Sequence, residues 1–245
     1  MGDIFEKKYA LNYYDFDKNY KLKPTTMMNL LQDISTIHFE SRTDHLSREI
    51  LNGLWVIVEW QVTMDQMPEK IMTLTVKTEP IYFRKFIAYR RYEIEDELGV
   101  KIGSGISKWA YIDPFTRRQA NLPKILNEIF NVDEAAEKPE RFEFDILEPS
   151  SFFESQRMSV FSDLDINKHV NNVTYIKWAI DTLGSAFLDS RTIKALKVTF
   201  KREVFEEEVV TVSTAKKETA AGAVSSHIIS NSESNLCVQL QLEWQ

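Results

Sequence analysis

The densest run of polar side chains in the sequence extends from residue 162 to residue 172 and reads SDLDINKHVNN. Within it Asp165, Asn167 and His169 are spaced two residues apart, and side chains at that spacing project to one side of an extended segment. A carboxylate, an amide and an imidazole gathered in this way could orient a histidine, exchange a proton and stabilise an oxyanion. The run therefore predicts a site for attack on a carbonyl carbon, although a polar turn before a helix would use the same residue types.

A helix is expected to begin near Asn171, directly after this run. The first N–H groups of a helix have no partner within the helix and carry a partial positive charge, which favours a developing oxyanion. Asn171 or Asn172 could also serve as the N-cap of that helix.

A further carboxylate, Glu203, stands at the end of an expected strand, in the sequence FKREV. It is a second candidate for a functional residue. It could equally be a surface carboxylate, because the acidic run 206–208 follows closely.

The sequence repeats itself at an offset of 148 residues. Residues 15–19 read DFDKN and residues 163–167 read DLDIN, and each copy leads into an expected helix. The first copy has Lys21 where the second has His169. A histidine in one copy alone fits a site that was retained in one half of the chain and lost in the other.

The order of expected elements is the same in both halves. Apolar residues recur at spacings of three and four over residues 25–44 and 171–188, which predicts two amphipathic helices. Strand patterns follow each helix, at 55–64, 71–79, 86–95 and 101–112 and again at 193–201, 208–216, 223–230 and 236–244. We therefore expect an α+β protein with two tandem hot-dog halves, each a long helix wrapped by an antiparallel sheet. Residues 1–140 form the first half with the connecting segment, and residues 141–245 form the half that carries the motif.

Composition excludes several classes of function and site. The net charge of −7 is unfavourable for generic nucleic-acid binding, and seven glycines leave no glycine-rich phosphate loop. The single cysteine, Cys237, excludes an internal disulfide and a cysteine metal site. We expect neither cofactor nor metal. The first twenty residues lack the apolar core of a signal peptide and no apolar run is long enough to span a membrane, so we expect a cytoplasmic protein without membrane insertion.

The motif resembles the signature of the acyl-ACP thioesterases, which release fatty acids from acyl carrier protein. Residues 163–176 read DLDINKHVNNVTYI and are similar to that family's D-L-D-x-N-x-H-V-N-N-x-x-Y-I. Residues 28–33, 53–62, 109–123 and 200–203 are similar to further segments of the family, so the resemblance covers almost the whole chain. It implies a double hot-dog fold, thioester hydrolysis and four catalytic residues, namely Asp165, Asn167, His169 and Glu203.

One departure from the family pattern affects the mechanism. Many plant members have cysteine where this chain has Val204, so a Cys-His-Asn mechanism cannot operate at that position. We therefore favour a route in which Glu203 activates water or a carboxylate attacks directly, with Asn167 and helix N–H groups at the oxyanion. Asp165 would hold His169 or act as the nucleophile, and the sequence does not choose between these roles.

The resemblance also implies partners. The substrate would combine a fatty-acyl chain with acyl carrier protein, an acidic protein that should dock on a basic face. Six residues are candidates for that basic face: Arg84, Lys85, Arg90, Arg91, Arg117 and Arg118. The alternative is that they form an ordinary solvated surface. The chain could also form a homodimer. Three other readings remain open: a hot-dog thioesterase acting on acyl-CoA, a hot-dog enzyme that dehydrates or hydrates an acyl chain, and a non-catalytic acyl-binding protein.

Overall fold

The computed structural model describes residues 2–47, 49–140, 143–144, 147 and 152–245. The chain divides into two compact units, which are described separately below. The first contains Met1–Tyr13, Asn29–Val62 and Ile71–Arg141, and the second contains Tyr14–Met28, Thr63–Lys70 and Phe142–Gln245. Among the described residues, no helix is both long and apolar enough to cross a membrane.

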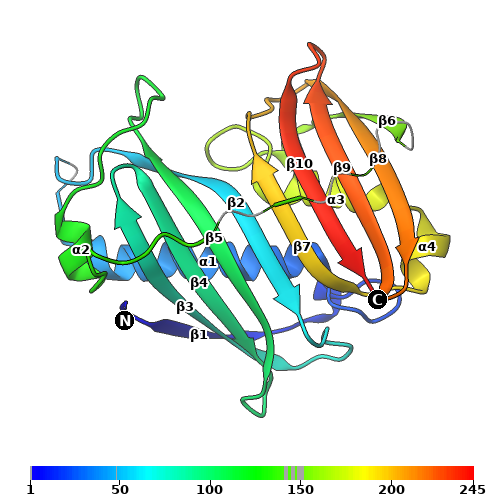
Figure 1. The fold of residues 1–245 in the computed structure, drawn as a ribbon, viewed down its shortest axis with the longest axis horizontal. Coiled ribbons are helices and arrows are strands. Elements are labelled where there is room, and N and C mark those ends of the chain that lie inside the picture. Colours follow the sequence, from blue (N-terminus) through cyan, green and yellow to red (C-terminus); the bar gives the residue numbers. More distant parts are fainter. Residues whose placement is uncertain (1, 48, 141–142, 145–146, 148–151) are drawn as a thin grey trace. The chain divides into compact units, whose positions relative to one another are not determined.

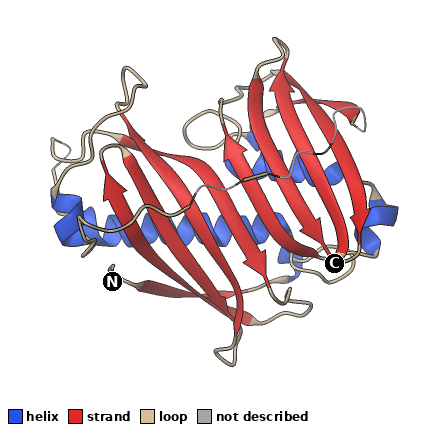
Figure 2. Cartoon of the chain, viewed as in Figure 1, coloured by secondary structure: helices blue, strands red, loops and turns tan. Residues whose placement is uncertain are grey.

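The first sheet is antiparallel and has the strand order β1-β3-β4-β5-β2. Helix α1 runs across one of its faces (Figures 1 and 2). The elements of this half are β1 (Phe5–Ala10), α1 (Pro24–Thr43), β2 (Leu54–Met64), β3 (Thr73–Arg84), β4 (Ile87–Glu95), β5 (Lys101–Ile112) and the short helix α2 (Ile125–Ile129).

The apolar stripe of α1 holds the helix on this sheet. Leu31 and Ile34 are completely buried, and the hydroxyl of Ser35 lies 2.7 Å from the Tyr92 hydroxyl on β4. Burial of an aliphatic side chain of this size contributes roughly 1.5–3 kcal/mol, so the stripe predicted from periodicity is the main reason why α1 packs here.

The second sheet repeats this arrangement, with the strand order β7-β10-β9-β8-β6. Helix α3 packs on it: the Thr182 hydroxyl at its end lies 2.8 Å from that of Thr214 on β8. The elements of this half are β6 (Phe153–Met158), α3 (Asn172–Asp181), α4 (Ser185–Asp189), β7 (Ile193–Phe200), β8 (Val209–Thr219), β9 (Gly222–Asn231) and β10 (Leu236–Trp244).

The helix expected over residues 171–188 is interrupted, so that prediction was wrong in its middle. Gly184 has φ of 78°, a conformation that favours glycine, and it separates α3 from α4 as the N-cap residue of α4. The Thr182 hydroxyl also donates to the Ala179 carbonyl, which competes with the helical bond. Leu183 and Phe187 are nevertheless both buried, so the apolar periodicity continues across the break and conceals it.

The duplication extends to elements that the sequence did not reveal. β1 begins at Phe5 and β6 begins at Phe153, again 148 residues apart, and each pairs with the edge of its own sheet. Both strands were missed because their side chains alternate between partly buried and exposed, which leaves a weak hydrophobic signal. The predicted boundary after residue 140 adjoins residues outside the described part of the chain, and it stays a prediction.

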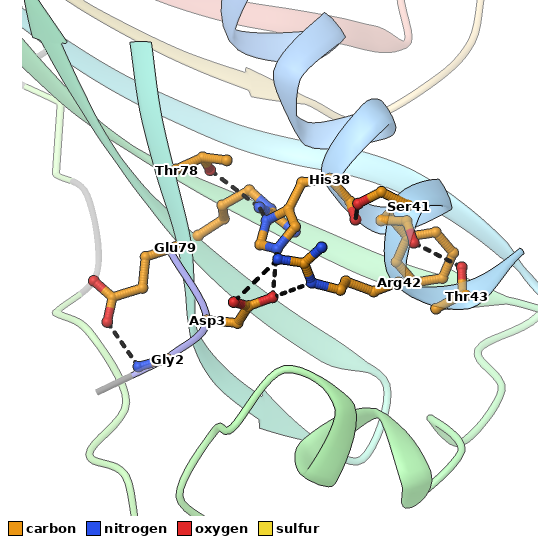
Figure 3. Close-up of polar contacts among 10 residues, drawn as sticks. Gly2, Asp3, His38, Ser41, Arg42, Thr43, Thr78 and Glu79 are labelled. Atoms are coloured by element: carbon orange, nitrogen blue, oxygen red, sulfur yellow. Dashed lines mark hydrogen bonds and ion pairs between the residues drawn. The ribbon is translucent and has the colours of Figure 1, made fainter. Parts of the chain in front are cut away.

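A buried polar cluster ties the N-terminal segment to α1 in the first unit (Figure 3). Because an arginine can only donate, Nη1 of Arg90 donates to Nδ1 of His38 at 2.9 Å, and Nε2 of His38 then donates to Asp3 at 3.0 Å. Asp3 also accepts from Nε of Arg42. Arg90 is buried in this cluster, so its candidacy for a basic docking face was wrong.

The two buried histidines should make the protein sensitive to acid. Burial, assisted by the charge of Arg90 and opposed by Asp3, lowers the pKa of His38 to about 4 from 6.5, and burial also lowers the pKa of His227. The unfolded chain therefore binds a proton at His38 before the folded chain does. The contribution of uncharged His38 to the free energy of unfolding is fully present above about pH 6.5. It declines by about 3 kcal/mol as the pH falls towards about 4.

Urea unfolding across this pH range checks the effect. His38→Gln should reduce the slope of unfolding free energy against pH by up to about one proton. His45→Gln, at a side chain that is 66% exposed, is the matched control for loss of a histidine. Equal slopes for the wild type and His38→Gln would contradict the assignment.

A candidate active site at the repeated loop

The loop that carries Asp165, Asn167 and His169 is a tight turn, so the expected extended conformation was wrong. The Asp165 N–H donates to the His169 carbonyl at 2.9 Å, and the Lys168 N–H donates to the Asp165 carbonyl at 3.0 Å. Lys168 closes the turn with φ of 68°. An isolated bridge between Leu164 and Val170 joins the two ends of the loop.

The Asp165 carboxylate fixes the inside of this turn. Its Oδ1 accepts the backbone N–H of Asn167 at 2.8 Å, and its Oδ2 lies 3.4 Å from the Asn167 side-chain amide. A hydrogen bond to a charged acceptor contributes about 1.5–3 kcal/mol. Asp165 is therefore a structural element of the loop, and the exposed Asn167 amide is directed towards it.

The His169 imidazole lies between two carboxylates. Its Nδ1 is 3.8 Å from Oδ1 of Asp165, and its Nε2 is 3.6 Å from Oε2 of Glu203. These distances fit ion pairs or contacts bridged by water and exceed those of direct hydrogen bonds. The three side chains are 17%, 27% and 35% exposed for His169, Asp165 and Glu203, so the group is accessible from solvent. No set of three metal-ligating side chains occurs among the residues described.

Val204 holds Glu203 in place beside the histidine. Its carbonyl accepts the N–H of Val170 at 2.8 Å, and its own N–H donates to the Tyr175 hydroxyl at 3.0 Å. The residue after Glu203 is thereby hydrogen-bonded to Val170, the residue after His169. The Val204 side chain is fully buried, and its backbone positions the site.

Tyr175 was not identified as a site residue from the sequence, although it lies within the signature. Burial raises the pKa of Tyr175, so its hydroxyl remains protonated while it accepts the Val204 N–H. The only sequence signal was its place in the motif, three residues after Asn172 on the buried stripe of α3.

Ser159 braces the turn that follows Glu203. It is completely buried, its N–H donates to the Glu208 carbonyl at 3.0 Å, and its hydroxyl donates to the Phe205 carbonyl. The Glu208 N–H donates back to the Ser159 hydroxyl at 3.1 Å. The Phe205 carbonyl is thus fixed, and the centroid of the Phe205 ring lies 5.7 Å from that of the His169 imidazole, in an edge-to-face arrangement.

The start of α3 is less open to a ligand than the sequence suggested. Asn171 is the N-cap: its side chain accepts the Val173 N–H at 2.9 Å, and its carbonyl accepts the Thr174 N–H at 2.8 Å. The expectation that helix N–H groups stabilise an oxyanion therefore does not hold for these two amides.

The first copy of the motif forms the same turn in the same unit. Asp17 Oδ1 accepts the Asn19 N–H at 2.8 Å, the Asp17 N–H donates to the Lys21 carbonyl at 2.9 Å, and Tyr20 has φ of 60°. Each bond has its counterpart 148 residues later. The turn therefore forms without a histidine, and His169 is an addition to it.

Cys237 does not fit a nucleophile. It is completely buried on β10, and burial raises the pKa of its thiol. A cysteine nucleophile needs the opposite, a lowered pKa in a partly exposed position.

Comparison with known proteins identifies the family of this chain. The profile of the acyl-ACP thioesterase N-terminal domain matches residues 2–131, and that of the acyl-ACP thioesterase C-terminal domain matches residues 148–245. The chain belongs to the acyl-ACP thioesterase family. The sequence resemblance is thereby confirmed.

Two solved structures of this family share the fold. An acyl-ACP thioesterase from Bacteroides thetaiotaomicron superposes with a TM-score of 0.82 at 22% identity, covering 99% of this chain and 98% of that one. The 12:0-ACP thioesterase from Umbellularia californica gives 0.84 at 19% identity, covering 99% and 97%. The expected α+β double hot-dog fold is confirmed.

Curated acyl-ACP thioesterases of plants are longer than this chain. The palmitoyl-acyl carrier protein thioesterase of Cuphea hookeriana is 25% identical over all of this chain, which spans 63% of that protein. The oleoyl-acyl carrier protein thioesterase 2 of Arabidopsis thaliana is 23% identical over 85% of this chain, and 62% of that protein is covered.

Removal of the Tyr175 hydroxyl tests how much its hydrogen bond with the Val204 N–H contributes to stability. Tyr175→Phe leaves the buried Val204 N–H without its acceptor, so we expect the free energy of unfolding to fall by about 1–3 kcal/mol. Tyr13→Phe, at a side chain that is 75% exposed, is the matched control and should have little effect. Denaturant unfolding measures both, and equal stabilities would show that the bond contributes nothing.

Proposed function

We propose that this chain hydrolyses the thioester of a fatty acyl-acyl carrier protein and releases the free fatty acid. The observation that carries the proposal is the position of His169 between Asp165 and Glu203. Family membership supports the same activity, because the relatives of this chain are named for that reaction.

Glu203 is the proposed general base. It takes a proton from water as the water oxygen bonds to the thioester carbon, and it later returns that proton to the departing sulfur as the C–S bond breaks. Water and thioester are consumed, and carboxylic acid and thiol are formed. Nε2 of His169, 3.6 Å from Glu203, is placed to hold the water or to exchange the proton.

The proposed role of Asp165 is to stabilise the loop and to orient His169. Its Oδ1 accepts the Asn167 N–H, and Asp17 makes the same bond in a loop that has no histidine. This shared bond supports a structural role for Asp165 and disfavours the alternative in which it attacks the carbonyl. Asn167 is the proposed oxyanion donor through its side-chain amide, which would turn from Asp165 to the substrate.

Acyl carrier protein is the proposed carrier, since the relatives named above act on its acyl esters. A basic docking face remains the prediction for the carrier. After the exclusion of the buried Arg90, its candidates are the five exposed residues Arg84, Lys85, Arg91, Arg117 and Arg118.

Substitutions in the site should abolish most of the hydrolysis. We expect His169→Ala and Glu203→Gln each to lower kcat/KM by about a hundredfold or more, the usual contribution of a proton-transfer group. Asp165→Asn keeps an oxygen for the Asn167 N–H but removes the charge beside His169, and it should also be strongly impaired. Hydrolysis of an acyl-acyl carrier protein with release of free acid is the measurement.

Two control variants accompany these substitutions. Asp17→Asn makes the same change in the copy of the loop that lacks a histidine, and Cys237→Ala removes the buried thiol. Both should hydrolyse at near the wild-type rate. Near-normal rates for His169→Ala and Asp165→Asn would show that this is not the active site. A large loss of activity for Cys237→Ala would support a mechanism that uses the thiol.

The carrier is tested with one acyl chain on two carriers. We expect kcat/KM to be higher for the acyl carrier protein ester than for the coenzyme A ester, because a protein carrier adds a docking surface to the same thioester. Equal or faster hydrolysis of the coenzyme A ester would overturn the carrier assignment and leave the hydrolase assignment intact.

A further inference from the structure

A pocket of about 410 Å³ lies in the second unit, next to the first copy of the loop. The size falls within the range of small-molecule sites, roughly 300–1,000 Å³. Asp17, Lys21 and Leu22 of the loop line it, together with residues from α3, from the segment before β7 and from the end of β10. The candidate active-site residues Asp165, His169 and Glu203 are not among its lining residues.

Lys21, which lines this pocket, occupies the position in the first copy of the loop that His169 occupies in the second copy. The two loops have the same backbone bonds, and an offset of 148 residues places Lys21 on His169. The first copy has thus kept the shape of a substrate-handling loop and carries a cation in place of the imidazole. An ammonium group at this position favours binding of an anion.

The charge of Lys21 is only partly balanced, because the Asp189 carboxylate on which it acts is itself paired with Lys18 at 2.8 Å. The Lys21 ammonium donates to two uncharged backbone carbonyls, those of Arg191 at 2.8 Å and Asp189 at 3.3 Å. An ammonium has three donors, so one N–H is left for a ligand. Lys23 likewise donates to a carbonyl, that of Tyr14 at 2.7 Å, and the exposed Lys177 contributes a further positive charge to the lining.

The acidic groups of the pocket balance this charge only in part. Asp17 uses Oδ1 to accept the N–H groups of Asn19 and Lys21. Arg191 is paired with Glu218 at 2.7 Å. With Arg191 set aside, three lysines face two carboxylates, those of Asp17 and Asp181.

Apart from Thr25 and Thr192, the rest of the lining is apolar. Leu22, Ile193 and Trp244 are buried and form a hydrocarbon surface, which Ile180 and Met67 extend. A ligand that uses both parts of the pocket needs a negative head and an apolar tail.

We propose that this pocket binds a medium- or long-chain carboxylate without hydrolysing it, with the carboxylate at Lys21 and Lys177 and the chain on Trp244 and Ile193. The identification of this ligand class with the reaction product rests on the proposed function. The chain would then hold released fatty acid at a second site, the former active site of its first half.

Photoaffinity labelling with a diazirine derivative of dodecanoate tests the proposal on the full chain. Peptide mapping should find label on segments that line the pocket, such as those containing Ile180, Ile193 or Trp244. Lys177→Glu and Lys21→Met should each weaken dodecanoate binding by about tenfold or more, while leaving any label near His169 in place. Lys217→Glu makes the same charge change at an exposed residue of the same unit outside the lining and should bind normally.

Dodecanol provides the test of charge, since it has the same chain without the carboxylate. It should compete at least about tenfold more weakly than dodecanoate. Equal competition by dodecanol, normal binding by both lysine variants that remain folded, or label confined to peptides outside the pocket would each overturn the proposal. Binding is measured without turnover, so a chain that fails to hydrolyse thioesters could still pass, and an active hydrolase could still fail.

Discussion

One hydrogen bond determines the geometry on which both loops depend: an aspartate Oδ1 accepts the backbone N–H two residues later. Asp165 makes it to Asn167 and Asp17 makes it to Asn19, each at 2.8 Å. The bond lets the chain reverse within five residues and enter a helix at a fixed point. It acts together with the backbone bonds that close each turn, and together they define the position of the side chain four residues after the aspartate.

The two halves therefore differ less in architecture than in what the shared loop presents. Both have a helix on five strands that follow the same order, and both begin with an outer strand at the same offset. In the second half the loop presents an imidazole between two carboxylates. In the first half it presents an ammonium that is anchored on carbonyl oxygens. The same loop thus places chemically different side chains at equivalent positions in the two copies.

Local patterns in the sequence were enough for the fold, and they singled out candidate residues of which Asp165, His169 and Glu203 lie together in the structure. The strand patterns and the stripe of α1 were correct because each is repeated along a long element that buries one face. The break at Gly184 was missed because Leu183 and Phe187 keep the apolar spacing on both sides of it. Arg90 was misplaced on the surface because a buried guanidinium is recognisable only once its partner His38, 52 residues away, is known.

The Tyr175 hydroxyl has a consequence for the equivalence of the two copies. At the offset of 148 residues its counterpart is Met27, a buried side chain without a hydrogen-bonding hydroxyl. A single Lys21→His substitution would give the first loop an imidazole but no phenol at position 27 to accept a backbone N–H, as Tyr175 does from Val204. The two copies therefore differ in the groups around the loop as well as in one side chain, and changing that side chain alone would not make them equivalent.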